Sequence, residues 1–451
     1  MIFIIIILTF LFAFLIKVFK KKYSLYVAIL ITFLDFIFIL SLPGCLKTNF
    51  EFLGISFLYD DLSFLFATTS TFVALLIFIY SLGYFKNEKE KSFFSFWALF
   101  FLGSMLGVIF SDNLLSLYFF WEIAGLCSYR LIGTYKVSEH LLKADKAFMV
   151  TGGGAGIMFL SFAFIYSLTG TFYLSKMVGF SVPWFVFLLF FIGVITKSAT
   201  FPLHIWLPEA SVAPTPVTAF LHAAVLVKIG IYGLLRLFWK TLSVEGNIIW
   251  AIYLALISSL IAGFVALIEK DFKKILAYST VSQLGFLITG VLLLNERAIR
   301  GILVFYLAHA LGKCGLFLTA GVMEKVFETK DITKMGSIMK KMPQITVGYF
   351  LSMLSVIGIP PFLGFFGKLD VIAGSFENKL FLVGFLLCIS SILTLLYLWR
   401  TFKFVFIREN ININMELENI EIMNLVVVLL GIFSLLAGII FLFLEGGAFG
   451  Y

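Results

Sequence analysis

Ionisable side chains lie within long apolar runs of this sequence, where a charged group is costly. On membrane-insertion scales, a charged side chain at the centre of a spanning helix costs about 2.5–3.5 kcal/mol. Each such residue therefore indicates a partner or a role in moving charge. Carboxyls, lysines and histidines spread over several helices are typical of a proton-relay path. The candidates are Asp35, Glu122, Lys197, His222, Lys228, His309, Lys313 and Lys368.

The spacing of these residues predicts which of them share a helix face. His309 and Lys313 are four residues apart, so they lie on one face, one turn from each other. His222 and Lys228 are six apart, a poor match to one face, and we expect them to bracket a cavity. Lysines near helix ends often extend to the membrane surface. This explanation suits Lys228 poorly, because a further apolar run follows it.

The sequence allows two explanations for each of two buried carboxyl groups. Glu122 either pairs with a lysine of another helix and stays ionised, or is a protonated carboxyl hydrogen-bonded within a helix bundle. Asp35 has no obvious partner, so a buried hydrogen bond and a contact with a neighbouring protein both remain open.

Composition places the whole chain in a membrane. Of its 451 residues, 61% are hydrophobic and 13% are charged, and the mean hydropathy is +1.09. Soluble proteins average about 45–50% apolar and about 25% charged residues. A soluble globular enzyme, a nucleic-acid-binding protein and a disordered scaffold are therefore excluded. The net charge of +8 needs no nucleic-acid partner, since lysine and arginine gather in the cytoplasmic loops of membrane proteins.

The sequence predicts no cofactor, no metal site and no redox or hydrolytic site in this chain. Its four cysteines are scattered without a CxxC pair. Lys368 follows Gly367 but lacks the remainder of a phosphate-binding loop, and the glycines at 152–156 lack a dinucleotide fingerprint. We expect these glycines to serve close helix packing. Iron–sulfur clusters, nickel–iron or flavin would then belong to partner subunits.

Fourteen apolar runs are long enough to suggest membrane helices. The first is interpreted as a retained helix and not as a signal peptide, because no basic segment precedes it. If the basic residues at 20–22 face the cytoplasm, the other loops that are rich in lysine and arginine also lie on the cytoplasmic side. This arrangement predicts a cell-membrane protein with both termini outside. The runs are 2–19, 23–43, 61–82, 93–111, 114–132, 146–168, 182–200, 214–239, 249–268, 275–294, 298–324, 345–372, 379–406 and 422–444.

Proline and glycine residues interrupt the predicted helices in two places, near the seventh apolar run and within the twelfth. Non-helical backbone at membrane depth is tolerated where protein or water satisfies it. Broken helices in corresponding positions of two halves indicate an inverted repeat with an ion path. The predicted breaks are at Pro202, Pro208, Pro214 and Pro216, and at Gly358, Pro360 and Pro361. The expected divisions are residues 1–92 (helices 1–3), 93–240 and 241–410 (the two repeats), and 411–451 (helix 14).

The sequence around the first break resembles a known family. The segments are TKSATFPLHIWLPEA at 196–210, APTPVTAFLHAA at 213–224 and KIGIY at 228–232. They resemble the signature of the antiporter-like subunits of respiratory complex I, membrane-bound hydrogenases and Mrp cation/proton antiporters. Similar segments are WE at 121–122, KKILAYSTVSQLG at 273–285, HALGK at 309–313 and GIPPFLGFFGK at 358–368.

The resemblance implies an all-α fold of about fourteen membrane helices, with two inverted five-helix repeats and discontinuous seventh and twelfth helices. It implies that Glu122 pairs with Lys197 and that Lys228 connects to His309 and Lys313. Lys368 becomes the lysine on the outlet side. Some family members carry an aspartate in the sixth helix, where this chain has glycines at 152–156.

These features predict an ion-translocating subunit of a complex I-related assembly. In this hypothesis, a partner subunit separates Glu122 from Lys197, and the proton then moves toward Lys228, Lys313 and Lys368. The expected partners are other membrane subunits, the bilayer and redox subunits on the cytoplasmic side. A redox-driven pump and an Mrp-type exchanger of sodium for protons both remain open. A carrier of an organic solute and a passive scaffold are less favoured, because titratable groups along a path outnumber selective ligands.

Overall fold

The computed structural model describes residues 2–18, 21–42, 48–52, 55–135, 137–224, 226–409 and 420–446. These residues are largely helical, and the fourteen apolar runs fall on helical segments, of which the run 214–239 is divided among several short helices and turns. The chain divides into two compact units, Met1–Ile248 and Ile249–Tyr451. Lys20, one of the basic residues used to predict the topology, lies outside the described residues, as do Cys45, Lys136 and both chain ends.

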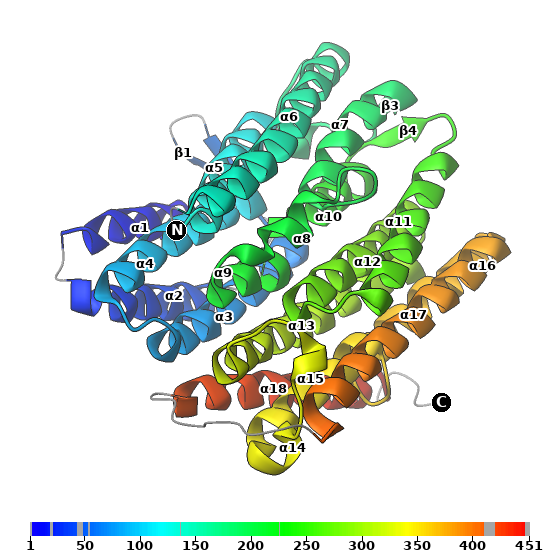
Figure 1. Cartoon of the computed structure of the whole chain (residues 1–451). Coiled ribbons are helices and arrows are strands. Elements are labelled where there is room, and N and C mark those ends of the chain that lie inside the picture. The colour runs from blue at the N-terminus through cyan, green and yellow to red at the C-terminus, as the bar shows by residue number, and fades with distance from the viewer. Residues whose placement is uncertain are drawn as a thin grey trace. The chain divides into compact units, whose positions relative to one another are not determined.

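The first unit begins with seven helices (Figure 1). Polar side chains fix several of their starts, because an Asp or Asn oxygen accepts the otherwise unpaired backbone N–H groups of the first turn. Asp60 caps α3 in this way together with Ser63, and Asn113 caps α5. The helices are α1 (Ile2–Ile16), α2 (Ser24–Ser41), α3 (Asp61–Tyr84), α4 (Glu88–Phe110), α5 (Leu114–Ile132), α6 (Ser138–Thr169) and α7 (Trp184–Lys197).

The chain after α7 follows an irregular helical path, as the prolines predicted. Two short helices, α8 (Trp206–Glu209) and α9 (Thr215–Ala219), precede a π-helical turn at Phe220–Ala224 and a 3₁₀ turn at Leu226–Lys228. The path continues as α10 (Ile229–Leu234) and a second π-helical turn, Leu235–Trp239. Pro202 lies in the turns between α7 and α8, Pro208 lies inside α8, Pro214 precedes α9, and Pro216 lies in its first turn.

The second unit contains the other predicted break. Gly358 has a φ of +86°, a conformation that glycine adopts readily, and it ends α15. The next helix starts only at Leu363, after Pro360 and Pro361. Within this unit α11, α12 and α13 run side by side (Figure 1). The helices are α11 (Ile249–Ile268), α12 (Phe272–Leu292), α13 (Glu296–Phe327), α14 (Ile338–Lys341), α15 (Pro343–Ile357), α16 (Leu363–Glu377), α17 (Phe381–Phe402) and α18 (Ile420–Gly446).

The described helices have the length and polarity of membrane spans. Ten of them are long and apolar enough to cross a bilayer, and α1, α7 and α15 are shorter apolar helices. Large apolar side chains on α1, α2, α6, α17 and α18 are exposed, as expected for surfaces that face lipid. Extended structure is confined to short pairs in the described residues: β1 (Thr48–Phe52) with β2 (Ile55–Tyr59), antiparallel, and β3 (Ser181–Pro183) with β4 (Ser243–Glu245), parallel.

Candidate functional site

Lys197 is the last residue of α7, and its ammonium group contacts α5. Its side chain is 1% exposed, and Nζ donates a hydrogen bond of 3.3 Å to the backbone oxygen of Trp121. The same Nζ lies 5.7 Å from the centre of the Trp121 ring. A cation at the carboxyl end of a helix is favoured by the helix dipole. The break after α7 thus places a buried positive charge beside the turn of α5 that carries Glu122.

Glu122 lies close to Lys197 without touching it. The two charges interact electrostatically, and Tyr118 lies near Glu122 on the same helix. No ion pair between Glu122 and Lys197 within 4.0 Å occurs among the side chains that the structure describes, and Glu122 Oε1 makes no hydrogen bond there. The structure therefore places the predicted partners on neighbouring helices, separated by more than a direct contact.

Gly154 allows α6 to approach α7 next to Lys197. A methyl group at Gly154 would overlap the side chain of Thr196, whereas a methyl group at Gly152, Gly153 or Gly156 would meet nothing within 4 Å. The expected packing role of this glycine cluster therefore holds for Gly154 alone.

We predict that Gly154→Ala lowers both the stability of the assembled protein and its transport, because it pushes Thr196 and the adjacent Lys197 away from α6. Overpacking of this kind costs about 1–3 kcal/mol. Gly153→Ala is the matched control: it adds the same methyl group in open space and improves helix propensity. Thermal unfolding of the two variants in detergent checks the prediction, and equal melting temperatures would contradict it.

The irregular helix that follows carries His222 and Lys228, both fully buried. His222 lies in the first π-helical turn, and Lys228 ends the 3₁₀ turn. Lys228 Nζ donates a hydrogen bond of 2.5 Å to the backbone oxygen of Ala223. Its ammonium group therefore folds back onto the backbone beside His222.

The second unit buries His309 and Lys313 completely on one face of α13. Lys313 Nζ donates to the Ser279 hydroxyl of α12 and, at 3.2 Å, to the backbone oxygen of Leu276. The rings of His309 and Phe305 lie edge to face with their centres 6.1 Å apart. The side chains of His309 and Lys313 therefore both lie among identified neighbours in the interior of the second unit.

Lys368 lies near the start of α16, and its side chain reaches the second helix break. Its Nζ donates a hydrogen bond of 3.2 Å to the backbone oxygen of Ile357, the last residue of α15. The carbonyls at a helix end lack partners within the helix, so Lys368 of α16 satisfies one of them. The rings of Phe305 and Phe286 lie 5.1 Å and 5.8 Å from Nζ. Phe305 therefore touches both His309 and Lys368.

Asp35 has a hydrogen-bonding partner within the chain. The Thr9 hydroxyl of α1 donates to its carboxylate at 2.9 Å, and the side chain is 5% exposed. Of the two alternatives left open by the sequence, the structure shows the buried hydrogen bond.

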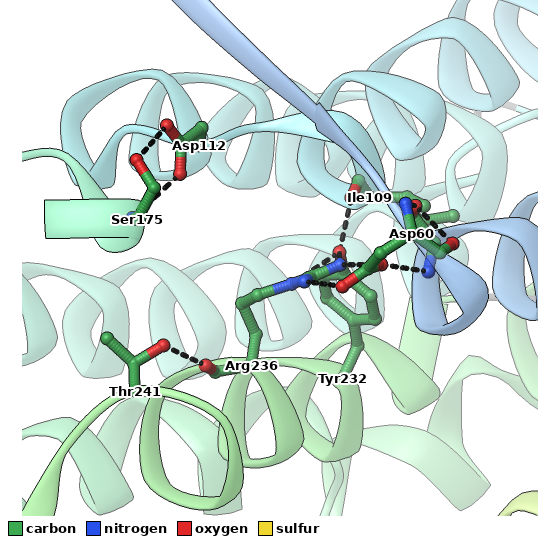
Figure 2. Close-up of polar contacts among 8 residues, drawn as sticks. Asp60, Ile109, Asp112, Ser175, Tyr232, Arg236 and Thr241 are labelled. Carbon is green, nitrogen blue, oxygen red and sulfur yellow. Dashed lines mark hydrogen bonds and ion pairs between the residues drawn. The ribbon is translucent and has the colours of Figure 1, made fainter. Parts of the chain in front are cut away.

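A charged cluster that the sequence did not single out joins the segment after Lys228 to neighbouring helices of the first unit (Figure 2). Arg236, 2% exposed, binds both carboxylate oxygens of Asp60 at 2.6 and 2.9 Å. It also donates to the Tyr232 hydroxyl at 2.7 and 3.0 Å, and Tyr232 in turn donates to the backbone oxygen of Ile109. Tyr232 and Arg236 follow Lys228 at intervals of four residues. The cluster therefore anchors the helix that carries Lys228 to α3 and α4.

A second carboxylate holds the neighbouring loops together. Asp112 is 1% exposed and accepts hydrogen bonds from the Ser175 backbone and hydroxyl at 2.9 and 2.7 Å (Figure 2). Ser56 adds a third at 3.0 Å. Asp60 and Asp112 escaped sequence analysis because they lie between apolar runs. The sequence did offer one signal for this cluster, because Arg236 is a charged residue within an apolar run.

We predict that Arg236→Gln destabilises the assembled protein by about 1.5–3 kcal/mol, because it removes the charged hydrogen-bond partner of the largely buried Asp60 carboxylate. The matched control is Arg297→Gln, which removes a half-exposed arginine bound to Glu377 and Asp370. It should cost about 1 kcal/mol or less, because Arg300 still binds Asp370. Thermal unfolding at pH 7 measures both. Equal destabilisation by the two substitutions would contradict the prediction.

The ion pair between Asp60 and Arg236 predicts that the protein loses stability in acid. Burial alone would raise the pKa of Asp60, but the hydrogen bonds and charge of Arg236 outweigh it and lower the pKa to about 2. An unfolded aspartate has a pKa of about 3.9. The stabilisation by Asp60 is therefore complete above about pH 4 and is lost as the pH falls toward 2. Asp60→Asn should remove this component of the acid dependence between pH 4 and 2, and an unchanged acid profile would contradict the assignment.

Comparison with known proteins identifies the family. Residues 111–394 match the family model of the NADH:quinone oxidoreductase/Mrp antiporter membrane region, and residues 50–95 match that of the complex I chain 5 N-terminus. Subunit 5 of the chloroplast NAD(P)H-quinone oxidoreductase of Anthoceros angustus is 34% identical over 78% of this chain and 51% of its own length. A Na⁺/H⁺ antiporter subunit of Alkalihalophilus pseudofirmus is 34% identical over 86% of this chain and 53% of its own. The chain thus spans about half the length of these relatives.

Two solved structures share the fold over nearly the whole chain. A chain of the Mrp complex from Dietzia sp. DQ12-45-1b superposes with a TM-score of 0.85 at 19% identity, covering 98% of this chain and 95% of its own. A chain of respiratory complex I from Thermus thermophilus gives 0.84 at 23% identity, covering 97% and 95%. With its matching sequence, fold and apolar helices, the chain is a multi-pass membrane protein and belongs to the antiporter-like subunit family shared by NADH:quinone oxidoreductases and Mrp antiporters.

Proposed function

We propose that this chain translocates protons, or exchanges sodium for protons, as a subunit of a complex I-related membrane assembly. The observation that carries the proposal is the placement of one buried lysine at each helix break. Lys197 is the last residue of α7 and donates to the Trp121 carbonyl of α5, whereas Lys368 of α16 donates to the Ile357 carbonyl at the end of α15. Buried ionisable groups on irregular membrane helices are typical of ion paths.

The first step proposed is a change in the distance between Glu122 and Lys197. The two groups are near enough to interact but make no direct ion pair in the described residues, so a small movement of α5 against α7 changes their interaction. A partner that separates them removes the negative charge that favours protonated Lys197. The proton then passes toward Lys228 beside His222 in the first unit, and toward His309, Lys313 and Lys368 in the second.

The proposed membrane arrangement follows the sequence analysis. It has about fourteen crossings in two inverted five-helix repeats, discontinuous seventh and twelfth helices, and both ends on the outer side of the cell membrane. In support, α7 ends at Lys197 and α15 ends at Ile357, so each predicted break coincides with the end of an apolar helix. Cysteine accessibility to a membrane-impermeant thiol reagent, in variants with a single cysteine introduced at Lys340 or Lys176, tests the sidedness: Lys340 is expected inside and Lys176 outside.

The two versions of the proposal differ in the source of energy that drives transport. In the favoured version, a redox module such as a membrane-bound hydrogenase or a dehydrogenase supplies energy, with iron–sulfur clusters, nickel–iron or flavin in its own subunits. In the alternative, the chain belongs to an Mrp-type exchanger without redox chemistry. The relatives named above include subunits of both kinds of assembly. Carriage of an organic solute is the least favoured version.

Gentle purification of the native complex tests the choice of driver. Co-purification of redox subunits with nickel, iron or flavin would support a pump driven by electron transfer. A complex of membrane subunits free of redox centres would support the sodium/proton exchanger. Recovery of this chain alone, active in solute uptake, would contradict both versions.

A further inference from the structure

Among the described residues, the buried ammonium group of Lys368 has no carboxylate partner within 4.0 Å. Asp370, two residues further along α16, is already bound by Arg297 and Arg300 of α13. The hydrogen bond of Lys368 runs to the backbone oxygen of Ile357 at 3.2 Å. An ammonium group carries three donors, and a buried charge is costly unless neighbouring groups stabilise it. One carbonyl therefore leaves room for another kind of partner.

Two phenylalanine rings supply such a partner to Lys368. The ring centres of Phe305 on α13 and Phe286 on α12 lie 5.1 and 5.8 Å from Nζ. An aromatic face attracts a cation within about 6 Å, and more strongly where both are desolvated. The two rings meet edge to face with their centres 5.6 Å apart, and both are inaccessible to solvent. They therefore favour the protonated form of Lys368, because a neutral amine lacks the charge that the rings attract.

Two glycines bring Lys368 against Phe305. A methyl carbon at Gly367 would lie 2.6 Å from the backbone nitrogen of Phe305, and one at Gly301 would lie 2.7 Å from the backbone oxygen of Gly367. These distances are shorter than van der Waals contact, so α13 and α16 approach this closely only because both positions lack a side chain. Lys368 directly follows Gly367. The close packing of the two backbones thus determines which ring the lysine meets.

The Phe305 ring also contacts His309, one turn further along α13. The two ring centres are 6.1 Å apart, and the ring planes meet at 75°. Both side chains are fully buried. Phe305 is therefore a neighbour that His309 and Lys368 share, and a shift of its ring changes the surroundings of both.

We propose that Phe305 and Phe286 are positioning residues that form an aromatic clamp for protonated Lys368, and that Phe305 links the charge of this lysine to His309. The inference rests on the proposed function, in which Lys368 carries protons. While Lys368 is protonated, its charge holds the Phe305 ring against the ammonium group. When the proton leaves, that attraction is lost, and the ring can shift against His309. The position of the ring beside His309 thus depends on whether Lys368 is charged.

Ring fluorination of Phe305 tests the clamp in the assembled complex, reconstituted into liposomes. Phenylalanines with one, two and three ring fluorines, incorporated at this position, nearly keep the shape of the ring but withdraw electron density from the face that attracts the cation. Ion transport should fall stepwise, by about fivefold to thirtyfold in all, the effect expected for a buried cation–π contact. The same series at Phe272 is the matched control, because this buried ring of α12 contacts Tyr349 and should leave transport unchanged. A flat or rising series at Phe305 would overturn the inference.

A double substitution separates the clamp from general damage to the fold. Phe305→Leu should slow transport, and adding it to Lys368→Gln should slow transport no further, because the charge that the ring attracts is already absent. Additive losses would overturn the inference. Lys368→Gln alone distinguishes the two levels. If it transports normally, the role of Lys368 in the proposed function fails, and the inference fails with it. If Lys368→Gln is slow while the fluorinated series at Phe305 is flat, only the inference fails.

Discussion

Lys197→Gln is expected to reduce ion translocation by the assembled complex about tenfold or more. Glutamine keeps a polar N–H donor at the position where Lys197 binds the Trp121 carbonyl, but it carries no charge and cannot release or take up a proton near neutral pH. Loss of a charge interaction of about 1.4–4 kcal/mol with Glu122 changes an equilibrium by tenfold or more. Proton uptake into proteoliposomes measures the effect.

The control for this prediction is Lys146→Gln. Lys146 is a half-exposed lysine of α6 that pairs with Glu209 at 2.8 Å. Its loss removes the same charge from the same unit and should leave transport near the wild-type rate, because exposed ion pairs contribute little. Normal transport by a well-assembled Lys197→Gln complex would refute the role given to Lys197. Failure of Lys197→Gln to assemble would favour a scaffold in which the charges only bridge helices.

Lys368→Gln is the second substitution with a large expected effect, again about tenfold or more. Lys368 is 4% exposed, bound to the last carbonyl of α15 and flanked by two phenylalanine rings. Glutamine keeps a polar N–H donor at this position, one bond closer to the backbone, while the charge is lost. Transport should therefore fall while the melting temperature of the complex changes little.

Lys340→Gln is the control for Lys368. Lys340 is 82% exposed and pairs with Glu409 only at 3.7 Å, so its replacement should change neither stability nor transport. If Lys368→Gln lowers the melting temperature strongly but leaves the transport rate per assembled complex intact, Lys368 serves the fold of the break and carries no ions.

The helices and their interruptions were predictable because local properties determine them. A run of about twenty apolar residues is favoured in a bilayer as a helix whatever its neighbours are. Proline lacks a backbone donor, and Gly358 adopts a left-handed conformation at little cost, so α15 ends where the sequence indicated. The candidate lysines were equally visible, since a charge among apolar residues stands out in one dimension.

The partners of those charges could not be predicted, because they come from distant parts of the chain. Asp60 binds Arg236 across 176 positions, and Lys197 binds a backbone oxygen 76 positions away. Backbone carbonyls have no signature in the sequence. Periodicity also failed between Thr215 and Trp239, where π-helical and 3₁₀ turns replace a regular helix and change which residues share a face.

The most direct test of the central claim is ion uptake by liposomes that contain the purified complex, with this chain either wild type or Lys313→Ala. The account predicts that the wild-type complex moves protons or sodium under its driving force, and that the fully assembled Lys313→Ala complex loses about tenfold or more of that rate. Equal initial rates for the two complexes, in protons and in sodium, would contradict the claim that ions pass through this chain along its buried lysines.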